Sequence, residues 1–365
     1  MQTRREFMRK SAVALGGIAF GGTSLGGFAR AASAASTAGK AGSLAVVTGY
    51  GSGSIFNYSL VLMQSYAKKL GVDVSLTSLK TALIRPALVS GEADLIMGFS
   101  PLTALGLADA GADAIVVADM VPISDYVIAV NSDTIKKPTD LYGKKLATSG
   151  PGTQSDMVSR LLVAQKGLDW GSIDIVPIAS STSRLPALLA GSIDAASLYH
   201  DQAFTAQAQN PKIRILLDSA RIVPTIFASA EGLRSKLEAK RDEVEKVLMA
   251  YAQVAAFAKL HPTKFVDGFM KAYPEAVRSA ALKTTKFYGQ KGYWDPDLKT
   301  HADILVTNGA QAVTAANPPL VPKTLPLSQW VDITYRNHAI KKLGGVGWWK
   351  PKPKPKPKHK KKNKH

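Results

Sequence analysis

The feature that most constrains this chain is an internal repeat with an offset of 100 residues. Residues 86–94 read PALVSGEAD, and residues 186–194 read PALLAGSID. Residues 46–51 (VVTGYG) and 146–151 (LATSGP) have the same offset. Each of these two segments begins with a short apolar run that leads into a glycine-containing turn. Two copies at this spacing are too few for a solenoid. They predict two lobes of similar construction.

Strand and helix patterns alternate through both copies. Short apolar runs predict strands, and stretches with apolar residues at helical spacing end at glycines. The predicted strands lie near 44–48, 72–79, 94–98, 144–148, 173–178, 193–198 and 213–217, and the predicted helices near 55–70, 101–111, 153–167 and 201–209. Such alternation is typical of mainly parallel sheets with helices on both faces. The predicted fold class is therefore α/β, with two lobes.

Two extended runs, 126–130 and 225–229, are interpreted as crossings between the lobes, which makes a two-strand hinge. The first lobe would then consist of 43–125 plus 226–345, and the second of 131–220. After Glu231 the pattern becomes almost wholly helical, and helices there would pad the first lobe. One helical stripe is apolar; it comprises Val244, Val247, Leu248, Tyr251, Val254 and Ala258.

The N-terminal segment 1–31 is organised as an export signal. It begins with Arg4 and Arg5 before a phenylalanine, continues with a glycine-rich apolar stretch, and reaches small residues around Ala31. The paired arginines resemble the signal of the twin-arginine route. We expect a periplasmic protein whose mature form begins near Ala32. A retained membrane anchor is the alternative, which the glycines disfavour.

The C-terminal segment 350–365 is a tail with nine lysines, alternating prolines and no acidic residue. It is predicted to be extended and disordered, because proline removes hydrogen-bond donors and the lysines repel one another. Two interpretations are open. The tail is a solvated end without a specific partner, or it is an electrostatic tether to an anionic envelope surface. Without the tail and 1–31, the net charge falls from +19 to +6, so the body gives no support for nucleic-acid binding.

The chain contains no cysteine, which excludes disulfides, thiolate metal sites, a cysteine nucleophile and the lipid-bearing cysteine of a lipoprotein. Neither a nucleophile elbow nor a phosphate-binding loop is present. The histidines of the body lack partners at metal-ligand spacing, so no metal site is predicted. His200 and Asp201 are the candidates for an acid–base pair in an enzyme. The alternative is that His200 is a structural or exposed histidine without a catalytic role. We expect no catalysis and no cofactor.

A binding site is predicted where parallel strands end, because ligands of open α/β sheets lie beyond the carboxyl ends of the strands. Three such turns per lobe are rich in hydroxyl, glycine or aromatic residues. Helix starts after these turns present free amide groups that favour anions. The alternative for the hydroxyls is simple helix capping. The candidate ligand-binding residues are Tyr50, Ser52, Ser54, Phe99, Ser100, Thr153, Gln154, Ser155, Ser181 and Tyr199.

Three segments carry a family resemblance. Residues 140–145 (DLYGKK) resemble the segment that opens the second lobe of many solute-binding proteins. With 90–94 (SGEAD) and 191–195 (GSIDA), they make residues 43–345 similar to the nitrate/sulfonate/taurine (NMT1/THI5-like) binding proteins of ABC transporters. The resemblance implies a type II periplasmic-binding-protein fold, without catalysis or cofactor, that holds a small anionic solute between its lobes. It also implies an ABC-type membrane permease as partner, and we expect a monomer.

Three alternatives remain at this stage. The turn at 51–58 (GSGSIFNY) is similar to receptors of TAXI-type TRAP transporters. An exported enzyme on the same fold would use His200 and Asp201. A structural protein of the envelope would depend on the basic tail. The identity of the solute stays open: the hydroxyl-rich turns favour sulfonate, nitrate, carboxylate or a similar small anion, and a neutral heterocycle is the alternative.

Overall fold

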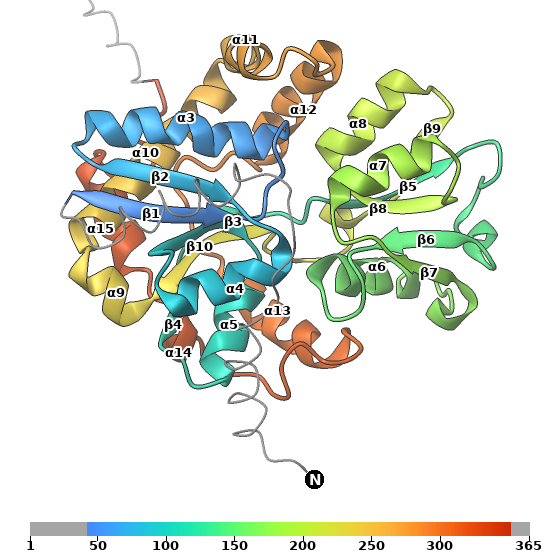
Figure 1. The fold of residues 1–365 in the computed structure, drawn as a ribbon, viewed down its shortest axis with the longest axis horizontal. Helices are drawn as coiled ribbons and strands as arrows, with labels where there is room; N and C mark the ends of the chain where they lie inside the picture. Colours follow the sequence, from blue (N-terminus) through green and yellow to red (C-terminus); the bar gives the residue numbers. More distant parts are fainter. Residues whose placement is uncertain (1–41, 352–365) are drawn as a thin grey trace, which may run out of the picture. The chain divides into compact units, whose positions relative to one another are not determined.

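The computed structural model describes residues 42–351, which all fall within one compact unit of the chain. In this part the strands form two five-stranded sheets (Figure 1). The first sheet contains Ser43–Thr48 (β1), Asp73–Ser78 (β2), Leu95–Phe99 (β3), Ala114–Val121 (β4) and Ala228–Leu233 (β10). The second contains Tyr126–Asn131 (β5), Lys145–Thr148 (β6), Asp174–Pro177 (β7), Ala195–Tyr199 (β8) and Ile213–Asp218 (β9).

The two sheets share one topology. Their strand orders are β2-β1-β3-β10-β4 and β7-β6-β8-β5-β9. In each sheet four strands run in the same direction, and the strand next to the edge, β10 or β5, is antiparallel to both of its neighbours. The sheets are therefore mixed, and the prediction of two lobes with mainly parallel sheets is confirmed.

The repeat seen in the sequence is a structural repeat. Val46 pairs with Leu95 in the first sheet, and the residues 100 positions later, Leu146 and Ala195, pair in the second. The aspartates that end the repeated motif have the same task. Asp94 accepts a hydrogen bond from the Ala45 amide at 2.8 Å, and Asp194 accepts one from the Lys145 amide at 2.9 Å. Each carboxylate thereby ties the start of its strand to the first strand of its sheet.

The first predicted crossing is wrong in position, and the second is right in part. Residues 126–131 form β5 inside the second sheet, and β10 of the first sheet begins at residue 228. The connections between the sheets are the segments 122–125 and 219–227, so 225–227 cross as predicted and 228–229 do not. The run 126–130 is apolar because it is an inner strand of its sheet, buried on both faces. An apolar run in a sequence does not distinguish these two situations.

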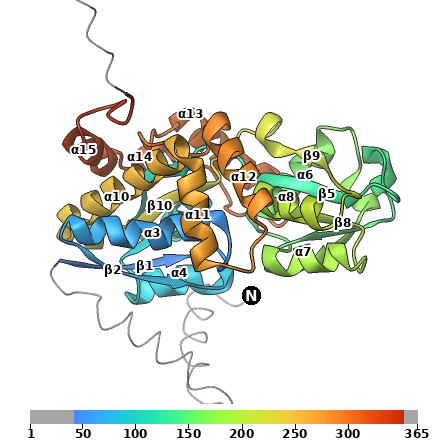
Figure 2. The same ribbon diagram turned by 90° about the horizontal axis from the view of Figure 1, so that it is seen from above.

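Helices cover both faces of each sheet. In the first sheet, α3 and α10 lie on one side and α4 and α5 on the other (Figures 1 and 2). The helices are Ile55–Lys69 (α3), Thr81–Ser90 (α4), Leu102–Asp109 (α5), Gln154–Ala164 (α6), Ser181–Leu189 (α7), His200–Gln209 (α8), Arg234–Ala239 (α9), Arg241–Leu260 (α10), Pro262–Ala272 (α11), Arg278–Lys291 (α12), Ala302–Thr314 (α13), Leu327–Trp330 (α14) and Thr334–Lys342 (α15). The short 3₁₀ helices are Pro138–Leu141, Trp170–Ser172 and Ser219–Arg221. Within residues 42–351, no helix meets the length and hydropathy that a membrane span requires.

The predicted apolar stripe after Glu231 is the buried face of α10, which packs on α3 and α15. Not every late helix pads the first sheet, however. α12 packs against α8, which belongs to the second sheet's side of the fold. The Lys283 side chain of α12 donates a hydrogen bond to Gln207 of α8 and lies over the Phe204 ring at 4.1 Å. The C-terminal helices therefore contact both halves. The predicted segment 1–31 and the tail beyond Pro351 lie outside the described residues.

Candidate functional site

The hydroxyl groups predicted to bind a ligand mostly cap helices. Ser54 Oγ accepts a hydrogen bond from the Asn57 amide at 3.0 Å, at the start of α3. Thr153 Oγ1 accepts one from the Asp156 amide at 3.3 Å, at the start of α6. Ser155 Oγ accepts one from the Ser149 amide at 2.8 Å. The capping alternative therefore describes Ser54 and Thr153, whereas Ser155 ties the turn at Ser149 to α6.

The other polar candidates also have partners. Gln154 donates from Nε2 to the Ile226 carbonyl at 2.9 Å, which links α6 to the second connection. Ser181 Oγ accepts a hydrogen bond from Gln202 Nε2 at 2.9 Å. Ser100 Oγ accepts a long one of 3.4 Å from the Leu102 amide. Ser52 is exposed on the rim of a cavity.

The two repeated turns lie close to the opposite half of the fold. A Cβ atom added at Gly51, in the first turn, would lie 2.9 Å from the Thr182 side chain at the start of α7. In the second turn, Ser149 accepts a hydrogen bond from Arg184, and Gln154 reaches the connection that returns to the first sheet. The carboxyl ends of the strands of both sheets therefore face a common region.

The aromatic candidates gather in this region, and two residues that were not predicted join them. Tyr50 follows β1, and Tyr199 ends β8. Between them lie Tyr126, the first residue of β5, and Phe227, the last residue of the connection 219–227. The Phe227 ring centroid is 6.2 Å from that of Tyr50, 5.4 Å from Tyr126 and 4.9 Å from Tyr199. Burial raises the pKa of all three tyrosine hydroxyls, so they are neutral hydrogen-bonding groups.

Arg184 is the functional candidate that the sequence prediction missed. Its side chain is fully buried, and Nε and Nη1 donate to the Ser197 carbonyl at 2.7 Å, the Ile178 carbonyl at 2.7 Å and Ser149 Oγ at 2.9 Å. Among the described residues it has no carboxylate partner, and the ionisable groups acting on it are the hydroxyls of Tyr199 and Tyr126. Burial lowers its pKa, but a guanidinium stays charged at neutral pH.

A signal for Arg184 was present in the repeat. The residue 100 positions earlier is Ile84, which is buried in the core of the first sheet. The second copy has an arginine where the first copy has a buried isoleucine. The repeat therefore predicts that the Arg184 side chain points inward and is not a solvated surface charge.

A cavity of about 190 Å³ lies next to this cluster, between elements of both halves. It is bordered by the first turn, by α7 and α8, and by the segment that leads into α12. Its lining residues are Ser52, Gly53, Ser54, Ile55, Thr182, Leu185, Asp201, Gln202, Thr205, Phe269, Glu275, Ala276, Val277, Ala281 and Thr284. Thr182 and Leu185 flank Arg184 on α7, so the cavity adjoins the buried cation without including it.

Asp201 bridges the two halves at the wall of this cavity. Its carboxylate accepts hydrogen bonds from the Gln202 amide at 2.7 Å and from the Ile55 amide at the start of α3. Burial, reinforced by the nearby Asp125 carboxylate, raises the pKa of Asp201 to about 7. The start of α3, predicted to attract an anionic ligand, therefore holds a carboxyl group of the chain itself.

His200 and Asp201 do not form the acid–base pair considered above, because His200 has other carboxylate partners. His200 is buried, and its Nδ1 lies 2.7 Å from Asp125 Oδ1, while Nε2 lies 3.4 Å from Asp218. Burial alone would lower the pKa of His200, but Asp125 and Asp218 raise it to about 9. Tyr288 of α12 donates a second hydrogen bond to Asp125 at 2.6 Å. His200 is thus a cation held at the connection, without access to the cavity lining.

The part of the chain that the structure describes contains no cluster of three or more histidine, aspartate or glutamate side chains that could hold a metal ion. The buried carboxylates at the connection instead neutralise His200. The site is therefore built from a buried guanidinium, tyrosine and serine hydroxyls, amides and aromatic rings. Such groups bind an oxyanion through hydrogen bonds and charge, without covalent chemistry.

Solved structures with similar folds include two proteins that bind sulfonates. The alkanesulfonate-binding protein SsuA from Xanthomonas axonopodis pv. citri, bound to MOPS, superposes with a TM-score of 0.65 at 18% identity, over 81% of this chain and 99% of that one. The aliphatic sulphonate-binding protein SsuA from Escherichia coli gives 0.61 at 19% identity, over 80% and 92%. The nitrate-binding protein NrtA from Synechocystis gives 0.56 at 12% identity, over 67% and 70%. These similarities establish the periplasmic-binding-protein fold.

The sequence comparison gives the family. No curated protein matches the chain. Residues 62–265, more than half of the sequence, match the family described as NMT1/THI5 like. The resemblance carried by the repeated Gly-x-x-Asp motif and by residues 140–145 is therefore confirmed, and the protein belongs to the NMT1/THI5-like family.

Proposed function

We propose that this protein is the periplasmic solute-binding component of an ABC importer and that it holds a small anionic solute between two lobes. The family and the fold support this function, since the similar structures include sulfonate- and nitrate-binding proteins. The single observation that carries the anionic character of the solute is Arg184, a fully buried cation without a carboxylate partner among the described residues.

The energetics of burial explain why Arg184 implies an anion. A buried charge costs several kcal/mol unless a counter-charge and hydrogen bonds compensate for it. Two carbonyls and one hydroxyl compensate in part through Nε and Nη1. A sulfonate, nitrate or carboxylate group would supply the missing charge and could accept hydrogen bonds from Nη2, the guanidinium nitrogen that makes none of these three bonds.

The proposed lobes are 43–125 plus 226–345 and 131–220, with β5 added to the second because it pairs there. Solute contacts from both lobes would favour the closed arrangement, with movement at the connections 122–125 and 219–227. We propose export through the twin-arginine signal at 1–31 and delivery of the solute to a membrane permease. Binding would be non-catalytic, because His200 is engaged at the connection and not at the cavity.

The test is a binding assay on the mature protein. Isothermal titration with alkanesulfonates, nitrate and carboxylates is expected to give one site per chain for at least one of them. A solute present at 100 times its Kd adds about 2.7 kcal/mol to the free energy of unfolding, which a thermal shift detects. Arg184→Gln is expected to weaken binding about 10- to 100-fold, because a charged hydrogen bond contributes about 1.5–3 kcal/mol.

Arg160→Gln is the matched control. Arg160 lies on α6, pairs with Asp156 at 2.8 Å and does not contact the cluster around Arg184. This variant should bind as tightly as the wild type. If Arg184→Gln binds the same anion with unchanged affinity, or if no anion binds at all, the proposed function is wrong.

A further inference from the structure

The region between the strand ends is walled by aromatic rings from both halves of the fold. Phe227 stands edge-on to Tyr126 and Tyr199, with interplanar angles of 72° and 78°, and is stacked with Tyr50 at 23°. Tyr126 and Tyr199 also meet edge to face, with centroids 5.3 Å apart. These four side chains, which we call the aromatic box, have the separations and angles that aromatic pairs prefer.

Two glycines make room for the rings on the side of the first sheet. A Cβ atom added at Gly98, whose φ is +76°, would lie 2.2 Å from the Tyr50 ring. A Cβ atom added at Gly49 would lie 2.6 Å from the Phe99 ring. Since both positions exclude any side chain, the rings of Tyr50 and Phe99 rest directly on the backbone at the ends of β3 and β1. The aromatic wall is built into the backbone and is not an incidental feature of side-chain packing.

The polar groups of the box are few and specific. The Tyr50 hydroxyl is buried and has no hydrogen-bond partner within the described residues. The Tyr126 hydroxyl donates to Gln154 Oε1 over 3.4 Å. Arg184 Nε donates to the carbonyl of Ser197 in β8, two residues before Tyr199, and Tyr199 pairs with Tyr126 of β5, so the cation is attached to the strands that carry two of the rings. A cluster of aromatic rings, one cation and one buried hydroxyl without a partner among the described residues therefore occur together.

We infer that the solute is an aromatic monoanion, whose ring lies among Tyr50, Tyr126, Tyr199 and Phe227 while its acid group pairs with Arg184. This inference rests on the proposed function and narrows its substrate class. The rings touch one another in this structure, so the solute enters as the halves separate and is enclosed as they approach. A single negative charge balances Arg184, which unlike His200 has no carboxylate partner among the described residues, and the Tyr50 hydroxyl can donate to a second oxygen of the acid group.

The saturated analogue is the sharpest comparison, because it keeps the charge and the approximate volume and removes only the π system. Benzenesulfonate is expected to bind about tenfold more tightly than cyclohexanesulfonate, since the ring pairs supply favourable edge-to-face contacts beyond simple burial. It is expected to bind at least tenfold more tightly than benzenesulfonamide, which is neutral and leaves Arg184 without a counter-charge. Titration calorimetry of the wild-type protein measures all three.

Two variants separate the ring from the charge. Tyr199→Leu is expected to remove most of the preference for benzenesulfonate over cyclohexanesulfonate and to keep the preference for benzenesulfonate over benzenesulfonamide. Arg184→Gln is expected to do the reverse. Tyr142→Leu is the control for tyrosine loss, because Tyr142 is 43% exposed and lies outside the box. Circular dichroism checks that each variant is folded, and the wild-type comparison stands even if one of them is not.

The outcomes separate this inference from the proposed function. If cyclohexanesulfonate or ethanesulfonate binds as tightly as benzenesulfonate, the solute is an anion without an aromatic requirement; the inference then fails and the proposed function stands. If the sulfonamide binds as tightly as the sulfonate, the charge assignment to Arg184 is wrong and both fail. If no sulfonate, carboxylate or nitrate binds, both are wrong.

Discussion

At the scale of single residues, several ionisable groups of this fold are buried where their charge is costly. Glu231 in β10 is fully buried; it accepts hydrogen bonds from the Ala104 amide at 2.8 Å and from Ser229 at 2.7 Å, and burial raises its pKa to about 8. The pKa of Asp201 is raised to about 7 for the same reason, and that of His200 to about 9 by its carboxylate partners. All three bind protons more tightly in the folded protein than in the unfolded chain.

Stability should therefore fall as the pH rises. The Glu231 contribution is fully present below the ordinary pKa of 4.5 and is lost as the pH rises through about 8. Glu231→Gln removes this titration, so we expect its melting temperature to fall less than that of the wild type between pH 5 and pH 9. The difference corresponds to a few kcal/mol, on the order of 1.36 kcal/mol for each unit by which the pKa is raised.

Glu275→Gln is the control, because it makes the same substitution at an exposed carboxylate and should keep the difference between pH 5 and pH 9 seen in the wild type. Parallel melting curves for wild type and Glu231→Gln across this range would show that Glu231 does not titrate as described.

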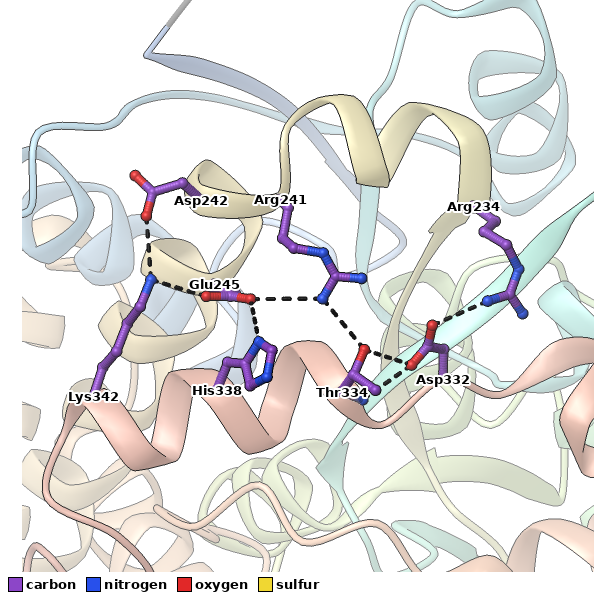
Figure 3. A network of polar contacts seen from close by, with 8 residues as sticks. All are labelled: Arg234, Arg241, Asp242, Glu245, Asp332, Thr334, His338 and Lys342. Atoms are coloured by element: carbon purple, nitrogen blue, oxygen red, sulfur yellow. Dashed lines mark hydrogen bonds and ion pairs between the residues drawn. The ribbon is translucent and has the colours of Figure 1, made fainter.

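At the scale of elements, the C-terminal helix α15 is attached to α10 by a network of charges (Figure 3). Glu245 of α10 is 4% exposed and lies 2.9 Å from Lys342 Nζ, 3.0 Å from His338 Nδ1 and 3.7 Å from Arg241 Nη1. Arg241 also lies over the Tyr335 ring of α15 at 3.9 Å. One buried carboxylate thus holds cations from both helices, although about 75 positions separate these helices in the chain.

Replacement of Glu245 by alanine should loosen α15. The variant leaves Arg241, His338 and Lys342 without their shared partner, and we expect a loss of about 1–3 kcal/mol in the free energy of unfolding. Asp242→Ala is the matched control on the same helix, because Asp242 is 58% exposed and its pairs with Lys246 and Lys342 should contribute less than about 1 kcal/mol.

Urea unfolding measures the free energies of unfolding, and hydrogen exchange of 334–342 localises the effect of Glu245→Ala. Equal losses in the two variants, or unchanged exchange in α15, would show that burial of the carboxylate is not what secures the helix.

At the scale of the whole described molecule, the two sheets are joined by a buried charge cluster at their connections. Asp125, in the segment 122–125, contacts His200 of α8 at 2.7 Å and Tyr288 of α12 at 2.6 Å. Tyr293 donates a hydrogen bond at 3.1 Å to the Ser124 carbonyl in the same connection. The cluster therefore ties α8 and α12 to the segment where relative movement of the halves would occur.

Removal of the Asp125 charge should change how the halves are held. Asp125→Asn leaves the His200 cation with less compensation in a buried place, which favours arrangements in which water reaches it. The chain has no cysteine, so Leu83→Cys and Ala190→Cys provide two exposed spin-label sites, one in α4 and one following α7. Double electron–electron resonance between the two labels should give a broader distribution with longer distances when Asp125→Asn is added than in the labelled protein without it.

Asp133→Asn removes an exposed carboxylate that pairs with Lys212 and should leave the distribution unchanged. Identical distributions in the parent and Asp125→Asn would mean that the cluster does not restrain the two halves.

The amino-acid sequence by itself determined the repeated α/β organisation. The offset of 100 residues, the glycines at helix ends and the apolar stripe of α10 depend on local periodicity, which is written in neighbouring residues. The same local patterns located Tyr50, Phe99 and Tyr199 at strand ends, where the structure places them. They also predicted hydroxyls at helix starts, but local spacing could not distinguish a capping serine from one that binds a solute.

Only the tertiary structure decided how distant parts meet. It placed the predicted crossing 126–130 inside the second sheet, gave His200 the partner Asp125, which lies 75 positions away, and placed Asp201 at the start of α3. It also buried Arg184 and bonded it to the carbonyl of Ser197 in β8. The physical reason is that burial and charge compensation depend on contacts between segments far apart in the chain, and periodicity along one segment carries no information about them.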